Sequence, residues 1–250
     1  MAEKRILLFS LPGRNNDCAI PDVSSLQLFT LMKTIDIISI NILGKPELIS
    51  SEYQSVKTAF RKIPIETDVI ELGMNSFTGD MVQDKKHHGG NDKAICCYNS
   101  DHFIKWKNEF GFDLGPAAFG ENLTLRGDAA LETNVFIGDR YQLGEAIVEV
   151  SEPRGPCYVI GIRYNFKQFP VHLQQTGFTG YYLRTIQPGI VNKTDKLIHL
   201  SSHPEKISVM DVNYIRYHDP GNKEWLHRLV NLKELSLDWR EMFEKKLIKL

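Results

Sequence analysis

Short apolar segments separated by glycine turns run through the second half of the chain and constrain its fold more than any other feature. Residues 135–137, 140–143 and 146–150 are separated by the dipeptides Gly138-Asp139 and Gly144-Glu145. Apolar runs of this length joined by such dipeptides are typical of hairpins. Further strands are expected at residues 36–42, 67–72, 94–98, 181–186 and 196–200. Many short strands at this spacing favour a β-barrel over a sheet of alternating strands and helices.

The first part of the chain differs from this β-rich region. Residues 1–31 are expected to be an irregular N-terminal extension, because Pro12 and Gly13 interrupt their short apolar patch too early for a signal peptide. A degenerate targeting segment is the alternative interpretation. Residues 32–202 form the predicted barrel domain, which includes one helix that begins near Ser100 and ends before Gly111.

Residues 203–250 are expected to form a small C-terminal domain of three short helices. Apolar side chains recur there at helical spacing, and Asp219-Pro220-Gly221 interrupts the pattern. Ser208 and Ser236 stand where a hydroxyl can cap a helix. The apolar faces of the helices are interpreted as core, with a groove that docks a partner as the alternative.

Composition excludes several classes of protein and binding partner. Lys plus Arg number 30 and Asp plus Glu 31, so no global basic field recruits nucleic acid or an acidic membrane. No apolar run approaches the roughly 18 residues that span a bilayer. The four cysteines are too few and too irregular for a disulfide scaffold or a four-thiolate zinc site. Reduced thiols in a cytoplasmic protein are therefore expected.

Cys157 ends the most unusual stretch of the sequence, Pro153-Arg154-Gly155-Pro156-Cys157. Two prolines hold the backbone in a defined loop, and Arg154 can stabilise the thiolate, the form that binds metals and attacks electrophiles. The alternative is that Cys157 is a small buried hydrophobe. Cys96 and Cys97 are adjacent in a predicted strand and point to opposite faces, so they are interpreted as side chains with only a packing role.

A second constellation is the stretch His87-His88-Gly89-Gly90, followed by Asp92 and Lys93. The glycine pair allows backbone N–H groups to approach an anion closely, and His88 and Lys93 add polar or positive groups. The stretch therefore suits a ligand that carries phosphate. A plain turn is one alternative, and a zinc site is another, although the spacing of the histidines is not typical of zinc ligands.

Two weaker signals accompany these stretches. Glu121 and Asn122 lie between a glycine bend and a short apolar strand, where they can line a pocket or cap a turn. Arg184 lies in an aromatic-rich strand and needs a partner if it is buried. An anionic ligand and an internal salt bridge are both open as that partner.

These stretches, in this order, resemble the MOSC family, whose domain is named after the C-terminus of molybdenum cofactor sulfurase. The resemblance rests on HHGGNDKAI at 87–95, FGENLT at 119–124, IGDRYQLGEAIVEVSEPRGPC at 137–157 and GFTGYYLRTIQPGIV at 177–191. The C-terminal segment, with LSLDWR at 235–240, resembles the three-helix domain that follows MOSC in the YiiM-type subfamily. The resemblance covers about residue 36 to the C-terminus. It departs from the family pattern at Thr58-Ala59-Phe60, where members usually carry Thr-Gly-Ile.

The resemblance implies a mainly β fold: a closed antiparallel barrel of the pyruvate-kinase barrel type with a few helices, followed by the three-helix domain. It implies a molybdenum cofactor (molybdopterin), with Cys157 as metal ligand and Cys157 and His88 as catalytic residues. Residues at positions that would bind the cofactor are His88, Gly89, Gly90, Asp92, Lys93, Glu121, Asn122, Arg154 and Arg184. At the level of the family, pyridoxal phosphate binding is a further option.

The resemblance also implies an activity, the reduction of N-hydroxylated compounds such as hydroxylamino purines. A separate flavin or iron–sulfur reductase would supply the electrons, because the chain shows neither a flavin motif nor an iron–sulfur cysteine set. The oligomeric state stays open, with a homodimer as one option. One alternative is a non-catalytic carrier of the cofactor or of persulfide sulfur on Cys157. Another is a cysteine hydrolase with Cys157 as nucleophile and His88 as base.

Overall fold

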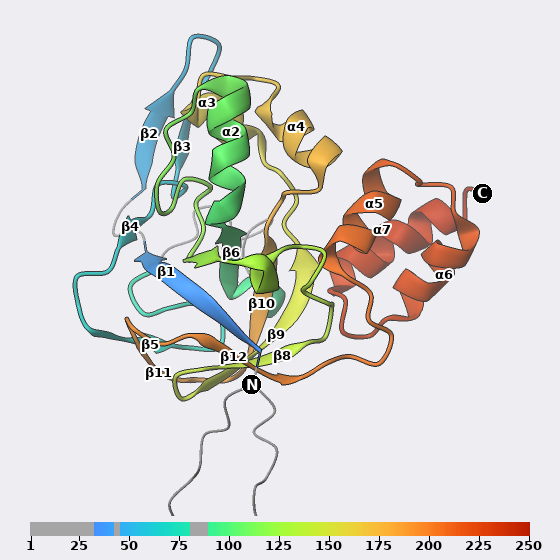
Figure 1. The fold of residues 1–250 in the computed structure, drawn as a ribbon. Coiled ribbons are helices and arrows are strands. Elements are labelled where there is room, and N and C mark those ends of the chain that lie inside the picture. Colours follow the sequence, from blue (N-terminus) through green and yellow to red (C-terminus); the bar gives the residue numbers. More distant parts are fainter. Residues whose placement is uncertain (1–32, 43–45, 81–89) are drawn as a thin grey trace, which may run out of the picture. The chain divides into compact units, whose positions relative to one another are not determined.

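A closed β-barrel dominates the part of the chain that the computed structural model describes, which is residues 33–42, 46–80 and 90–250 (Figure 1). Seven strands follow one another in the order β12-β8-β9-β10-β6-β7-β1, and β1 pairs again with β12. These strands are β1 (Thr34–Ile42), β6 (Ile95–Asn99), β7 (Leu123–Arg126), β8 (Arg140–Leu143), β9 (Ala146–Pro153), β10 (Tyr181–Gln187) and β12 (Leu197–Ser201). The predicted barrel is confirmed, and one neighbouring pair, β6 and β7, is parallel rather than antiparallel.

Alternation along the strands separates the barrel interior from an outer face that carries the candidate site. Cys97 pairs with Tyr181, and both belong to the hydrophobic core. Cys96 pairs with Tyr182, so these two side chains point the other way. The two adjacent cysteines therefore have different surroundings, as their positions in a strand predict.

A β-bulge in β9 changes this alternation next to the site. Tyr182 pairs with Glu152 and Leu183 with Val150, which leaves Ser151 unpaired between them. Val150 points into the core, whereas Glu152 shares the outer face with Tyr182. Without the bulge, a period of two would place Glu152 on the same face as Val150.

Shorter strands extend the barrel. β2 (Glu47–Ser50) and β3 (Ser55–Thr58) form a hairpin, β4 (Ile63–Pro64) pairs with β1, and β5 (Val69–Leu72) pairs with β11 (Gly189–Asn192). The strand expected at residues 135–137 is not a ladder strand. Its backbone instead meets the segment that leads into the C-terminal helices, through a single bridge between Phe136 and Ser208.

Helices and an aromatic cluster cover one side of the barrel. The helices of this cluster are α2 (Phe103–Phe110), α3 (Tyr158–Arg163) and α4 (Phe169–Thr176). The chain also forms three single turns, η2 (Asn91–Lys93), η3 (Ser100–His102) and η4 (Asp128–Ala130). Helix α2 ends as predicted at Gly111, which adopts φ 73°. The apolar patterns of α3 and α4 are too short to predict as helices. Trp106, Phe119 and Phe169 are buried in the cluster that these helices share with Tyr98.

The C-terminal segment forms the three expected helices, α5 (Val209–Tyr217), α6 (Lys223–Asn231) and α7 (Leu237–Leu247). Ser208 makes a full capping box with Asp211 at the start of α5. Ser236 occupies the N-cap position of α7, but its hydroxyl makes no capping hydrogen bond. The apolar faces of the helices join the same core as the barrel strands, as Leu226, Leu229 and Phe243 show.

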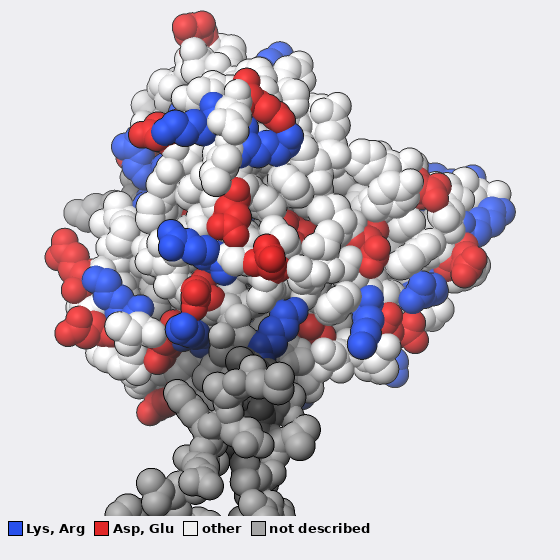
Figure 2. Space-filling model, viewed as in Figure 1, with Lys and Arg blue, Asp and Glu red and all other residues white. Residues whose placement is uncertain are grey.

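The surface shows no segregation of charge on the face in view. Figure 2 shows lysine and arginine interspersed with aspartate and glutamate over this face, in keeping with the formal net charge of −1. Among the helices of the described residues, none combines the length and apolarity that a membrane crossing needs.

Candidate functional site

An open pocket of about 220 Å³ lies against the outer face of β6 and β10, beside the loop that follows β9. This volume is several times the roughly 30 Å³ that one water molecule occupies in the liquid, so the pocket fits part of a small organic ligand. Its polar lining residues include Lys57, Lys62, Asp80, Lys93, Asn122, Arg154 and Cys157. Its apolar lining includes Val56, Ala59, Phe60, Phe119 and Val159.

Cys157 is presented to this pocket by the proline-rich loop. Strand β9 ends at Pro153, and Cys157 is the N-cap residue of α3 with extended backbone angles. Its side chain is half-buried and packs against the small apolar cluster of Ile49, Val159 and Ile162. A thiol in this position is held on a defined backbone and stays accessible from the pocket. The interpretation of Cys157 as a fully buried hydrophobe does not describe it.

Arg154 is a buried cation that makes no salt bridge to an acidic side chain among the described residues, although its charge interacts with the buried carboxyl group of Glu121. The residue is 5% exposed, and its guanidinium donates to the backbone carbonyls of Phe119 (2.9 Å) and Thr179 (3.5 Å). These bonds use only part of the donor set of a guanidinium. Because an uncompensated buried charge is costly, a cation that lines a pocket in this way favours an anionic group inside it.

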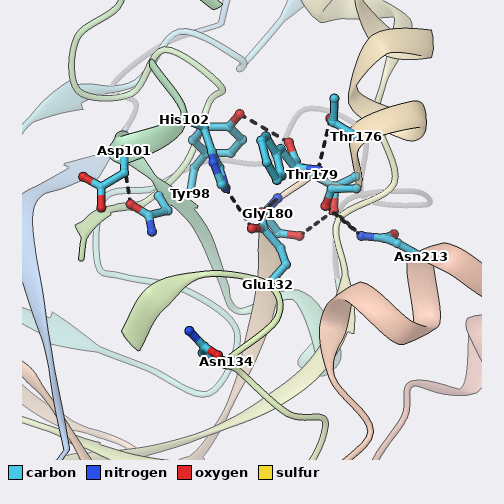
Figure 3. A network of polar contacts seen from close by, with 12 residues as sticks. Tyr98, Asp101, His102, Glu132, Asn134, Thr176, Thr179, Gly180 and Asn213 are labelled. Atoms are coloured by element: carbon cyan, nitrogen blue, oxygen red, sulfur yellow. Dashed lines mark hydrogen bonds and ion pairs between the residues drawn. The ribbon is translucent and has the colours of Figure 1, made fainter. Parts of the chain in front are cut away.

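A buried polar network holds the loop that supports Arg154. Figure 3 shows His102 against Glu132, which in turn accepts from the backbone N–H of Gly180. The two contacts measure 2.8 Å and 2.9 Å. The carbonyl of Gly180 accepts from the backbone N–H of Arg154, and Asn213 of α5 donates to Thr179. Both the barrel and the C-terminal helices therefore fix the position of Arg154.

Three further lining residues, Lys62, Asp80 and Asn122, form a chain of contacts. Lys62 Nζ lies 2.5 Å from Asp80 Oδ2, and Asn122 Nδ2 donates to the same oxygen at 2.8 Å. The amide of Asn122 also donates to the carbonyl of Asn41 and accepts from the backbone N–H of Cys96. Asn122 thus lines the pocket as predicted, while its amide is occupied in holding β1, β6 and Asp80 together.

Lys93 connects the pocket to the C-terminal helices. Its Nζ donates to Asp238 of α7 at 2.8 Å and lies 3.7 Å from a carboxylate oxygen of Glu152. Burial lowers the pKa of Lys93, but the hydrogen bond to Asp238 and the charges of Glu152, Asp238 and Asp92 outweigh it and raise that pKa above its ordinary value. Lys93 is therefore a cation in the pocket wall.

The other predicted residues lie elsewhere. Arg184 is engaged in an internal salt bridge, with contacts of 2.9 Å to Asp92 and 3.1 Å to Glu149. Glu121 is fully buried and accepts from the backbone N–H groups of Ala117 and Phe119, so it shapes the loop before β7. Gly90 precedes η2 and is not part of the pocket lining. His88 and Gly89 lie outside the described residues.

Several residues of the site were not predicted. Lys62, Asp80 and Tyr182 line the pocket, as does Cys96, which the sequence suggested had only a packing role. Burial raises the pKa of the Cys96 thiol to about 11, so it is protonated at neutral pH. The pairing of a buried lysine with an aspartate 18 residues later carries no local sequence signal. The sequence alone does not tell which of the adjacent Cys96 and Cys97 side chains points into the barrel and which faces the pocket.

Gly120 keeps the pocket wall closely packed against Phe60. It adopts φ +73°, and a Cβ there would stand 2.8 Å from the carbonyl oxygen of Phe60. We predict that Gly120→Ala lowers the free energy of unfolding by about 2 kcal/mol or more, through left-handed backbone strain and this contact. Urea denaturation measures the effect. Gly115→Ala is the control, because a Cβ at Gly115 meets nothing within 4 Å, and equal stability of the two variants would contradict the prediction.

Family models and relatives show which family this chain belongs to. Residues 84–198 match the model of the MOSC domain, and residues 207–249 match that of the YiiM-like, 3-alpha helix domain. The uncharacterized protein YflK from Bacillus subtilis is 39% identical over 210 residues, which cover 84% of this chain and 93% of YflK. The chain belongs to the MOSC family. The resemblance predicted from the sequence is confirmed.

Within the MOSC family, the crystal structure of YiiM from Geobacillus stearothermophilus is similar in fold. It superposes with a TM-score of 0.72 at 33% identity and covers 85% of this chain and 99% of that one. A protein from Gibberella moniliformis that is named a reductase is 34% identical over 134 residues, which cover 51% of this chain and 23% of that protein. Arg154 and Cys157 lie in the segment that matches the MOSC model, whereas the pocket residues from Val56 to Lys62 precede it.

Proposed function

We propose that this MOSC chain binds a molybdenum cofactor in the pocket and reduces N-hydroxylated compounds to amines in the cytoplasm, with electrons from a separate reductase. The observation that carries the proposal is Arg154, a buried cation without a salt bridge among the described residues, in a pocket that is also lined by Cys157. A group that offers both an anion and a soft metal would satisfy both side chains. The reductase name of the fungal relative supports the class of reaction.

The residues present fit such a cofactor. In the described ranges, no group of three His, Cys, Asp or Glu side chains is placed to hold a metal ion. A metal at Cys157 therefore needs most of its ligands from a cofactor, and soft thiolate ligands suit a soft redox metal. When bound, such a cofactor supplies the two-electron chemistry that reduction of an N–O bond needs.

The chain's own residues have distinct tasks in this proposal. Cys157 holds the metal, and Arg154 binds the anionic group of the cofactor with a planar donor set that suits phosphate. Lys62 and Lys93 place ammonium groups at the wall, each held by a carboxylate, Asp80 for Lys62 and Asp238 for Lys93. Phe60, Phe119 and Val159 provide the apolar surface that packs against a flat ring and excludes water.

Two measurements on purified full-length protein test the function. Protein from a host that makes the cofactor should contain molybdenum, and it should reduce an N-hydroxylated purine when a reductase or a chemical reductant is supplied. Molybdenum content without turnover would favour the non-catalytic carrier. A sulfane-sulfur adduct on Cys157 without molybdenum would favour persulfide transfer, and metal-independent hydrolysis would favour the cysteine hydrolase.

A further inference from the structure

Glu152 is a buried carboxyl group that neither the barrel nor the cofactor proposal explains. Its side chain is 2% exposed, and its Oε2 has no hydrogen-bond partner in the described part of the chain. The bulge at Ser151 places it on the outer face of β9, opposite Tyr182, which lines the pocket. Bulges commonly re-aim a side chain next to an active site.

Contacts to η2, to β10 and to the start of α7 stabilise this bulge. The hydroxyl of Ser151 lies within hydrogen-bond distance of the carbonyls of Asp92 (2.5 Å) and Tyr182 (3.0 Å), which share its one donor hydrogen. Its carbonyl accepts from the backbone N–H of Ser236, the residue that precedes α7. The position of Glu152 is therefore fixed by η2, β10 and the start of α7 together.

Lys93 links Glu152 to the pocket. Lys93 is one of the residues that line the pocket, and its Nζ lies 3.7 Å from Glu152 Oε1. The same Nζ donates to Asp238, whose side chain is 73% exposed. The three groups lie in a row that leads from exposed Asp238, through a hydrogen bond to Lys93, to the buried carboxyl group of Glu152, which is 3.7 Å from the lysine.

The charged groups around Glu152 come from every element packed against it. Lys93 and Asp92 face it from η2, Asp238 from α7, and the Ser236 hydroxyl lies nearby. Arg184 of β10 is held by Asp92 and Glu149. The pKa of Glu152 is raised to about 7, with burial as the largest cause. The Ser236 hydroxyl and Lys93 oppose this rise, and the charges of Asp238 and Asp92 add to it.

We propose that Glu152 and Lys93 deliver a proton to the substrate during N–O reduction. This inference rests on the proposed function. The overall change is R–NH–OH + 2e⁻ + 2H⁺ → R–NH₂ + H₂O, in which the N–O bond breaks, an N–H and an O–H bond form, and the separate reductase supplies the electrons. Lys93 gives one proton to the departing oxygen, and the neutral carboxyl group of Glu152 replaces it. The product state is the Lys93–Glu152 ion pair, and solvent supplies the second proton.

The protonation state of Glu152 also tunes Lys93 as an acid. An ionised Glu152 stabilises the ammonium group at 3.7 Å, whereas a protonated Glu152 does not. Lys93 is therefore a stronger acid when Glu152 is protonated. In that state Glu152 also holds the proton that it passes to Lys93 after Lys93 has protonated the substrate. In this arrangement Lys93 touches the reacting group, and Glu152 acts through Lys93.

The pH dependence of stability tests the titration of Glu152 without any need for activity. Between the ordinary pKa of 4.5 and the folded value of about 7, the folded protein binds more protons at Glu152 than the unfolded chain does. Stability from this group is therefore present at low pH and is lost as the pH rises through that window. From about pH 4 to about pH 8, the folded-to-unfolded ratio of the wild type should fall by roughly a hundredfold relative to Glu152→Gln. Parallel curves for the two proteins would overturn the proposal.

The pH dependence of turnover tests the proton transfer itself. With a chemical reductant and an N-hydroxylated purine, kcat of the wild type should fall as the pH rises through about 7. Glu152→Gln should keep its molybdenum, lower kcat by roughly a hundredfold, and lose this inflection. Glu149→Gln, a buried carboxyl on the same strand that pairs with Arg140 and Arg184, should keep both the rate and the inflection.

Different results would contradict the role of Glu152 and the proposed reductase function. A Glu152→Gln protein with the wild-type rate and the wild-type inflection would overturn the role of Glu152 and leave the proposed function intact. A wild-type protein that holds molybdenum but reduces no N-hydroxylated substrate at any pH would overturn the proposed function, and the proton transfer with it.

Discussion

Replacing Cys157 with serine should leave a folded protein that carries no molybdenum and reduces no N-hydroxylated substrate. The side chain is half-buried at the end of a loop, so an oxygen in place of sulfur disturbs the packing little. A neutral hydroxyl is a poor ligand for a soft metal, and the proposed metal ligand is therefore lost. We expect the molybdenum content to fall to background and the turnover by at least about a thousandfold, because the reaction depends on the bound group.

The second cysteine of the pocket provides the control. Cys96 lines the same pocket, but it is buried and its thiol is protonated at neutral pH. Cys96→Ser should therefore keep its molybdenum. Metal analysis, an activity assay and a thermal melt on both variants separate ligation from folding. Wild-type molybdenum in Cys157→Ser, or equal loss in both variants, would contradict the assignment of Cys157 as the ligand.

Replacing Arg154 with methionine should release the cofactor while the barrel stays folded. Methionine fills a similar volume but removes the buried positive charge that binds the anionic group of the cofactor. Loss of a charge-assisted hydrogen bond costs about 1.5–3 kcal/mol, so cofactor affinity should fall roughly tenfold to a hundredfold. Cofactor retention through gel filtration, measured as molybdenum and pterin content, shows the effect. Arg154→Lys should retain more cofactor than the methionine variant, because the charge remains.

Arg184 is the matched control for this experiment. It lies in the neighbouring strand β10, but its guanidinium is bound by Asp92, Glu149 and the carbonyl of Glu234 rather than facing the pocket. Arg184→Met should lower the free energy of unfolding by roughly 1–3 kcal/mol and leave cofactor retention unchanged. Greater loss of cofactor from Arg184→Met than from Arg154→Met would contradict this account and support the original prediction that Arg184 binds the cofactor.

Much of the fold was predictable because its signals are local. Turn dipeptides such as Gly144-Glu145 lie between β8 and β9, and helical spacing with the capping serine Ser208 begins the C-terminal domain. The closure of the barrel is different. The strand spacing favoured a barrel in general, but closure depends on the pairing of β1 with β12, which lie more than 150 residues apart, and no local pattern shows which strands meet.

The site was predictable where a short motif carries its own geometry. The prolines around Arg154 and Cys157 fix a loop by themselves, and the structure brings both residues into one pocket. The position of Glu152 could not be predicted in this way, because a strict alternation of strand residues places it on the inner face with Val150. The Ser151 bulge that corrects this depends on contacts with Asp92 and Ser236, which no local pattern reveals. For the same reason, Lys62 and Asp80 became candidates only in the folded chain.

Metal analysis of the full-length wild-type protein tests the central claim most directly. The protein should be purified from a host that makes molybdenum cofactor, beside a known molybdenum enzyme from the same host as a control for loading. We expect a molybdenum-to-protein ratio near one, with the metal lost in Cys157→Ser. A ratio near zero in the wild type, while the control enzyme is fully loaded, would contradict the claim that this pocket binds the cofactor.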